Sequence, residues 1–256
     1  TDLYILKGSG EEVYEPRFTY HGFRYVKIEG FPGNPDLNTI TGIVIHSDME
    51  PTGSFSCSDP LINQLQQNIQ WSLRGNFLDV PTDCPQRDER LGWTGDAQVF
   101  CTTAAFNFNV ASFFTKWLGD LAIDQLPDGS VPDVIPDVTT GSAAAGWADA
   151  AVIIPWNLYL FYGDKRILGE QYPSMKAWVE FMRKRAGNDY IWDGDPQYGD
   201  WQALVPSYVD NPNLITNKDF IATAYYCYTT GLLAKIASVL GKAEDAIRHP
   251  PGIHQV

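Results

Sequence analysis

Helical segments that alternate with loops rich in acidic and aromatic residues constrain this fold more than any other feature. Asp59 followed by Pro60 is a favourable helix start. Apolar residues then recur at every fourth position, at Leu61, Leu65, Ile69 and Leu73. This spacing predicts a helix with one buried apolar face. Comparable patterns predict further helices over about 97–121 (as one helix or two), 147–162 with a kink or break at Pro155, 173–185, and 220–240.

Helical hairpins whose loops gather on one face are typical of an α/α toroid. Closing such a ring takes about a dozen helices, and the pattern here supplies roughly six or seven. We therefore expect a mainly α chain in which residues 56–256 form the N-terminal part of an (α/α)6-barrel domain.

The first 50 or so residues have a different, β-like character. Residues 23–28 and 41–46 are rich in β-branched and aromatic side chains and lie close to glycines. These patterns predict two strands, which would not make a stable sheet on their own. We expect residues 1–55 to be the C-terminal strands of a β-sandwich domain.

The charge of the chain narrows the classes of partner. Acidic residues outnumber basic ones by 31 to 18, which gives a net charge of −13. This charge repels nucleic acid and anionic membrane surfaces, so we expect neither as a partner and favour a neutral substrate. No apolar run is long enough to span a bilayer. These features suit a soluble protein and do not separate a cytoplasmic from a secreted one.

The cysteines and histidines form no metal-ligand pattern. The cysteines are widely spaced and lack a CxxC pair, so a structural zinc site is not expected. We predict free thiols that are mostly buried, with a disulfide as the alternative, at Cys57, Cys84, Cys101 and Cys227. No metal or other cofactor is expected.

The stretch from Asp83 to Asp96 is the candidate site. It contains four carboxylates, two arginines and one tryptophan in a chain of which only 19% is charged. Cleavage of a glycosidic bond needs such a set: a carboxylic acid to protonate the leaving oxygen, further polar groups for hydroxyls, and an aromatic surface for the sugar ring.

Two strings in the chain resemble the bacterial α-L-rhamnosidases of glycoside hydrolase family 78. The first is the loop Asp-Cys-Pro-Gln-Arg-Asp-Glu-Arg-Leu-Gly-Trp-Thr-Gly-Asp over residues 83–96, and the second is Tyr-Glu-Pro-Arg-Phe-Thr-Tyr-His-Gly-Phe-Arg-Tyr over residues 14–25. The resemblance extends from about residue 3 to about residue 245. It implies β-sandwich domains followed by an (α/α)6 barrel, and an inverting enzyme that releases L-rhamnose from glycosides and polysaccharides.

The resemblance also implies roles for individual residues. Glu89 corresponds to the general acid, and Trp93 shapes the sugar pocket. Weaker matches to pocket tryptophans are Gly-Trp-Ala-Asp at residues 146–149 and Tyr-Gly-Asp-Trp at residues 198–201. The substrate-binding residues implied in this way are Asp83, Arg87, Trp93, Asp96, Trp147, Asp200 and Trp201.

Each assignment has a structural alternative. Glu89 would serve equally well in a surface salt bridge, and Arg87 in a carboxylate network. Asp83 suits a turn, and Asp96 suits the N-cap of a helix that begins at Ala97. The alternative for Trp147 and Trp201 is a core position. We predict core positions for Trp117, Trp156 and Trp178, which lie in apolar helical stretches, and a solvated loop, with a pocket rim as the alternative, for Asp128, Asp133 and Asp137.

Two departures from the family pattern affect the expected activity. The family's general base is a later glutamate, so we expect the base outside this chain. The double proline at residues 250–251 interrupts the helical pattern, and the sequence after about residue 247 looks foreign to the family. The alternative functions are a catalytically incomplete rhamnose-binding fragment and a glycosidase for another deoxy sugar. A partial toroid would also expose apolar helix faces, which favours self-association.

Overall fold

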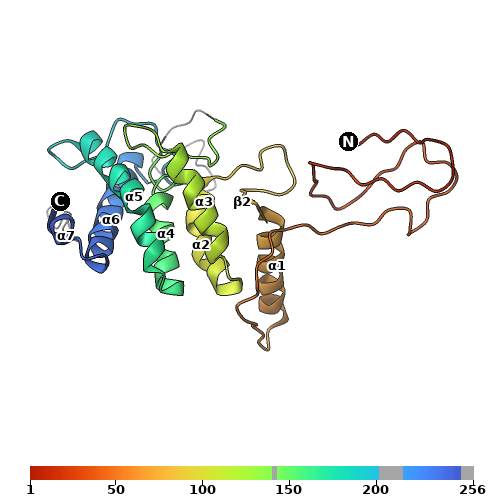
Figure 1. The fold of residues 1–256 in the computed structure, drawn as a ribbon, viewed down its shortest axis with the longest axis horizontal. Helices are drawn as coiled ribbons and strands as arrows, with labels where there is room; N and C mark the ends of the chain where they lie inside the picture. Colours follow the sequence, from red (N-terminus) through yellow and green to blue (C-terminus); the bar gives the residue numbers. More distant parts are fainter. Residues whose placement is uncertain (140–142, 202–215, 249–256) are drawn as a thin grey trace.

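The computed structural model describes residues 1–139, 143–201 and 216–248, in which regular structure is almost entirely helical (Figure 1). The expected mainly α character is confirmed. The helices are α1 (Pro60–Asn76), α2 (Thr94–Asn107), α3 (Ala111–Asp124), α4 (Ala150–Tyr162), α5 (Lys165–Ala186), α6 (Lys218–Val239) and α7 (Ala243–Arg248). A short antiparallel hairpin joins β1 (Phe77–Leu78) to β2 (Val80–Pro81).

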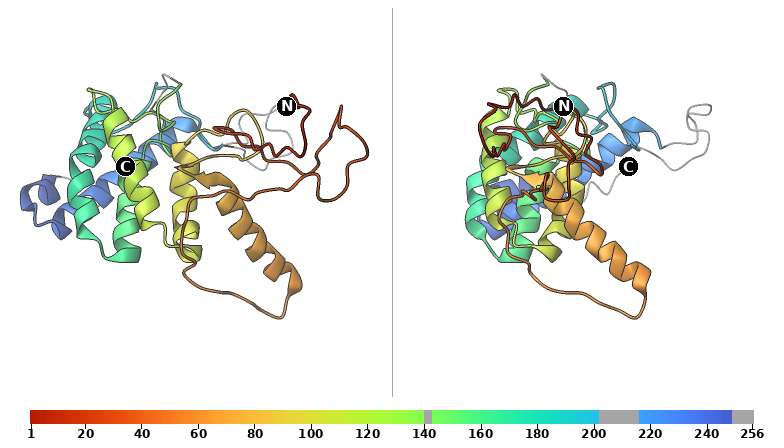
Figure 2. Two further views of the ribbon diagram at one scale, coloured as in Figure 1. Left: turned by 45° about the vertical axis from the view of Figure 1, so that its right-hand side comes forward. Right: turned by 90° about the vertical axis from the view of Figure 1, so that its right-hand side faces the viewer.

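Helices α2 to α6 pack in two layers. One layer contains α2, α4 and α6, with α4 against both of its neighbours, and the other contains α3 and α5. The layers meet where α4 packs on α3 and α5, and where α5 packs on α6. Helix α1 stands at one end of this row and inclines away from the other helices in the turned views (Figure 2).

The connections differ in length at the two ends of the helices. Short turns at residues 108–110 and 163–164 lie at one end. The described parts of the long connections, within residues 77–93, 125–149 and 187–217, gather at the opposite end (Figure 1). This arrangement brings together loop residues that are far apart in the sequence.

The apolar core lies between the two layers. Trp117 and Trp178 are fully buried there, as the sequence predicts. Trp156 packs against the core but is only half-buried, so its predicted core position is partly correct. Trp192 is fully buried as well, although it follows α5 in a loop; its ring packs edge-on against that of Trp178.

The predicted buried face of α1 is wrong at its N-terminal half, and Ile69 in the next turn is half-buried. Leu73 is buried, but the side chains of Leu61 and Leu65 are 79% and 57% exposed. The cause lies in the packing, because α1 stands at the end of the row and its C-terminal end contacts β1. The four-residue spacing predicted the helix correctly and the burial incorrectly.

The starts of α4 and α5 differ from the sequence prediction. Helix α4 begins at Ala150 instead of Trp147, because Gly146 adopts a φ of +79° and its N–H donates to the carboxylate of Asp149, which closes a turn. The helix then runs through Pro155 without a break. Helix α5 begins at Lys165, where the Asp164 side chain caps the N–H of Arg166, so Pro173 lies inside the helix and not at its start.

The two predicted N-terminal strands are not formed. Residues 1–50 contain no helix or strand, and apolar side chains such as Tyr25 and Ile43 are 86% and 64% exposed. The physical reason is that two short segments do not form a stable sheet by themselves. This segment lies beyond α1, at the opposite end of the molecule from α7 (Figure 1).

All four cysteines are free thiols, as predicted. Cys84 and Cys101 are buried, Cys227 is half-buried and Cys57 is exposed, so the expected burial holds for two of them and in part for a third. Within the described ranges, no helix has the length and apolar content that a bilayer crossing requires.

Candidate active site

The loop between β2 and α2 is closed at its base by hydrogen bonds between Asp83 and Leu91. The Asp83 N–H donates to the Leu91 carbonyl over 3.1 Å, and the Leu91 N–H donates to the Asp83 carboxylate over 2.9 Å. The Asp83 side chain is only 6% exposed. Asp83 therefore has a structural role in closing the loop, as its place in a predicted turn suggested.

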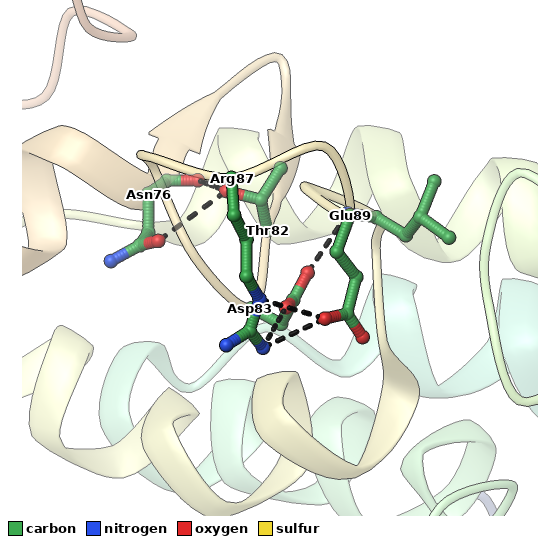
Figure 3. A network of polar contacts seen from close by, with 6 residues as sticks. Asn76, Thr82, Asp83, Arg87 and Glu89 are labelled. Carbon is green, nitrogen blue, oxygen red and sulfur yellow. Dashed lines mark hydrogen bonds and ion pairs between the residues drawn. The ribbon is translucent and has the colours of Figure 1, made fainter. Parts of the chain in front are cut away.

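Arg87 bridges two carboxylates within this loop (Figure 3). Its Nη2 lies 2.7 Å from Oε2 of Glu89 and 3.3 Å from Oδ2 of Asp83, and its Nε donates to the same Glu89 oxygen over 2.9 Å. The Glu89 side chain is 36% exposed, so it remains open to solvent. The ion pair agrees with a structural role for Arg87 and Glu89. The accessible Glu89 carboxylate agrees equally with a role as the general acid.

Asp96 lies in the first turn of α2 and does not cap it. The helix begins at Thr94 with Trp93 at the N-cap position, so the expected capping role of Asp96 is wrong. Partial removal from water, together with the negative charges of Asp83 and Glu89, raises the pKa of the Asp96 carboxyl. Asp96 therefore belongs electrostatically to the group of charges in the loop.

Four aromatic rings from three different loops form a cluster beside these charges. Trp147 lies 4.5 Å from Tyr198 and 6.2 Å from Trp201, measured between ring centroids. Tyr198 also packs against Trp93 at 6.3 Å and Trp201 at 5.6 Å. Trp147 and Trp201 thus lie in the loop cluster and not in the core, and Trp201 is 63% exposed. The buried indole N–H of Trp93 has no hydrogen-bond partner within the described part of the chain.

The aromatic cluster contacts α2 through a glycine. A Cβ atom at Gly95 would lie 2.7 Å from Cε2 and Nε1 of Trp147, closer than real Cβ atoms approach other heavy atoms. The indole of Trp147 therefore lies directly against the first turn of α2, one residue from Asp96. Gly95 joins the aromatic cluster to the charged loop.

Buried polar side chains fix the turn that carries Trp147. The fully buried carboxylate of Asp149 accepts hydrogen bonds from the Gly146 N–H over 2.7 Å and from Nε1 of Trp178 over 3.0 Å. Burial raises the pKa of Asp149 to about 6 despite these donors. Gln98 donates to the Gly146 carbonyl over 2.9 Å, which ties the same turn to α2.

Asp133, from the same connection between α3 and α4, and Gln197, from the connection after α5, also hold the turn. The Ala144 N–H donates to Asp133, and the Ala145 N–H donates to Gln197, the neighbour of Tyr198. The expectation of a solvated loop at Asp133 is therefore wrong: the residue is 2% exposed, and the Ala144 N–H takes the place of water at its carboxylate. Asp128 is exposed and Asp137 is half-buried.

Asp200 directly precedes Trp201 of the aromatic cluster in the sequence. It is exposed, and its carboxylate accepts a hydrogen bond from the Thr216 hydroxyl over 3.5 Å. The structure thus brings together Asp83, Arg87, Glu89 and Asp96 in one group, and Trp93, Trp147 and Trp201 in the adjacent one. Sequence reasoning missed Tyr198, which lies in the quoted string at 198–201, and Gly95, for which only its place in the 83–96 string was a signal.

Ligand-type atoms of Asp83, Cys84 and Glu89 lie within 4.8 Å of one another, the one such group in the described ranges. Arg87 already pairs with both carboxylates of this group. A guanidinium in this position supplies the positive charge that a metal would bring, so the donor set suits an ion-pair network better than a cation site.

Two family models cover nearly the whole chain. A model described as the bacterial alpha-L-rhamnosidase 6 hairpin glycosidase domain matches residues 50–250, and a bacterial alpha-L-rhamnosidase concanavalin-like domain model matches residues 1–46. The chain belongs to the bacterial α-L-rhamnosidase family. The resemblance seen in the sequence is thereby confirmed.

Relatives with this name support the membership. An alpha-L-rhamnosidase of Streptomyces avermitilis is 49% identical over 243 residues, which are 94% of this chain and 23% of the relative. The crystal structure of the S. avermitilis alpha-L-rhamnosidase complexed with L-rhamnose matches 95% of this chain and 23% of that one, with a TM-score of 0.86 and 46% identity. The rhamnosidase structure from Aspergillus terreus matches 92% of this chain and 28% of that one, with a TM-score of 0.84 and 45% identity. The chain thus spans about a quarter of the length of these relatives.

Proposed function

We propose that this chain is the acid-bearing part of a glycoside hydrolase that releases terminal α-L-rhamnose from glycosides or polysaccharides. The observation that carries the proposal is the accessible carboxylate of Glu89, paired with Arg87 beside an aromatic cluster. Family membership narrows the sugar to rhamnose. The proposed mechanism is inverting, with Glu89 as the general acid.

In this mechanism Glu89 gives its proton to the leaving oxygen while a base activates water on the opposite face of the sugar. The two groups of an inverting pair stand roughly 6.5–9.5 Å apart. The charged loop itself offers Asp83, which is buried and already paired, and Asp96, for which the family suggests hydroxyl binding. Because the base of the family is a later glutamate, we place the base outside residues 1–256.

The other site residues have distinct proposed roles. Arg87, Asp96 and Asp200 bind sugar hydroxyls, and Asp83 chiefly holds Arg87 and the base of the loop. Trp93, Trp147 and Trp201 provide the apolar surface on which the sugar ring and the rhamnose methyl group rest. Aromatic surfaces with a few polar groups are typical of sites for small neutral ligands.

The proposed architecture follows the same reasoning. We assign α1 to α7 to the first part of an (α/α)6 toroid over residues 56–256, because α2 to α6 form two layers with their long loops at one end. We assign residues 1–55 to the end of a β-sandwich domain. The family matches, which end at residue 46 and resume at residue 50, support a boundary in this region.

A second candidate is a rhamnose-binding fragment without activity. The observation that favours it is the aromatic cluster, which offers a surface for a sugar ring independently of any acid–base pair. Such a fragment would retain the aromatic cluster and the charged loop and lack the base.

Because the base is placed outside residues 1–256, the test measures release of p-nitrophenol from its α-L-rhamnoside by the longer protein that contains this chain and supplies the base. Glu89→Gln is the variant, and Glu170→Gln, at an exposed glutamate on α5, is the matched control. General acid catalysis contributes about 10²–10⁴-fold, so we expect Glu89→Gln to lose at least about 100-fold and the control to lose nothing. Equal activity of the two variants would contradict the role of Glu89. Release by none of the proteins, with L-rhamnose still bound, would favour the binding fragment.

A further inference from the structure

Residues 20–22 of the N-terminal segment contact the loop that carries Glu89. The guanidinium of Arg90 donates through Nη1 to the backbone carbonyl of Tyr20 over 2.6 Å. Its central carbon also lies 4.7 Å from the centroid of the Tyr20 ring, in cation–π geometry. One loop side chain is thus held by both the backbone and the ring of Tyr20.

Gly22 forms a second contact at another point of the loop. A Cβ atom at Gly22 would lie 2.7 Å from the carbonyl oxygen of Pro85 and 2.9 Å from Cα of Gln86. These are backbone atoms, which do not rotate out of the way as the end of a side chain does. The two contacts, at residues 85–86 and at Arg90, lie on either side of Glu89 in the sequence.

Within the loop, the main support of the outer part is the bridge that Arg87 forms between Asp83 and Glu89. No helix or strand lies between β2 and α2, and the hydrogen bonds between Asp83 and Leu91 close only its base. Arg90 adopts a φ of +45°, a left-handed conformation that costs energy for a residue with a side chain. The contacts of Arg90 with Tyr20 offset this cost next to Glu89.

We propose that Tyr20 and Gly22 are positioning residues, which hold the loop in the geometry that presents Glu89 to the sugar. They act through Arg90 and the backbone of residues 85–86. The proposal rests on the proposed function insofar as Glu89 is the acid. According to this proposal, the N-terminal segment supports the site through these contacts, although none of its residues belongs to the charged group or the aromatic cluster.

Hydrogen exchange of the loop peptide 83–92 tests the contact independently of any activity. The variant is Gly22→Ala, and the matched control is Gly53→Ala, where an added Cβ meets nothing within 4 Å. The same substitution restricts the unfolded chain equally in both. We expect loop exchange to be at least about tenfold faster in Gly22→Ala, which corresponds to about 1.4 kcal/mol, and unchanged in the control. Equal exchange in the two variants overturns the proposal, whether or not the chain binds a sugar.

The Kd for L-rhamnose then shows whether residues 20–22 position the loop for the sugar or only stabilise the loop. We expect the Kd to rise at least about tenfold in Gly22→Ala and in Arg90→Met. Arg90→Lys keeps a donor and a charge, at the same backbone cost, and should recover part of the loss. Faster exchange with an unchanged Kd overturns the positioning role. A wild-type chain that binds no L-rhamnose counts against the proposed function, while the exchange comparison still decides whether residues 20–22 hold the loop.

Discussion

At the scale of single residues, the site depends on carboxylates in contrasting surroundings. Glu89 is solvent-accessible and paired with a guanidinium, Asp96 is crowded by other negative charges, and Asp149 is fully buried among N–H donors. Only the first two are placed to meet a ligand. Asp149 holds the turn of Trp147 in place, and its burial makes its contribution to stability sensitive to pH.

We predict that Asp149 makes folding less favourable as pH rises from about 4 to about 6. Burial raises its pKa in the folded chain from 3.8 to about 6. Between these values the folded state keeps a proton that the unfolded state has lost. The contribution of Asp149 to the free energy of unfolding therefore falls by on the order of 1 kcal/mol per pH unit, and it is constant above about pH 6. The measurement is urea unfolding of the wild type and Asp149→Asn across this range. The free energy of unfolding of the wild type minus that of Asp149→Asn should fall with rising pH. A constant difference would contradict the prediction.

At the scale of elements, the glycines of two helices offer a direct comparison. Gly95 in α2 lies against the indole of Trp147, whereas an added Cβ at Gly119 in α3 meets nothing within 4 Å. Gly119→Ala should raise the free energy of unfolding by roughly 0.5–1 kcal/mol, because alanine is the better helix former. Gly95→Ala should lower it and change the near-UV circular dichroism, because the indole must move. If both variants are stabilised alike, Trp147 does not pack against α2 as described.

Elements were predictable from the sequence where they depend on local pattern. The four-residue spacing of Leu61 to Leu73 identified α1, and the contiguous 83–96 string identified the charged group, because each lies within one stretch of chain. The exposure of Leu65, the start of α5 before Pro173 and the place of Tyr198 were not predictable. They depend on which helix packs alongside, on the Asp164 cap, and on contacts between loops that are distant in sequence.

At the scale of the whole molecule, the exposed apolar side chains of α1 and α2 predict self-association. The most exposed of them are Leu61, Leu65 and Trp71 on α1 and Val99 and Phe106 on α2, with exposed fractions between 57% and 79%. Apolar surfaces of this kind tend to be covered by partners, and here two copies of the chain can cover each other. We expect dimers or larger species in size-exclusion chromatography with light scattering.

Replacing Leu61 and Leu65 by glutamine should shift the chain toward monomer, because both side chains lose apolar area that is in contact with water. The replacement leaves the fold intact, since neither side chain is part of the core. A matched double change elsewhere, Ile123→Gln on α3 together with Leu160→Gln on α4, removes two exposed apolar residues outside α1 and α2 and should have a smaller effect. A wild-type chain that elutes as a monodisperse monomer at every concentration would contradict the prediction. In that case the faces of α1 and α2 would tolerate water without a partner.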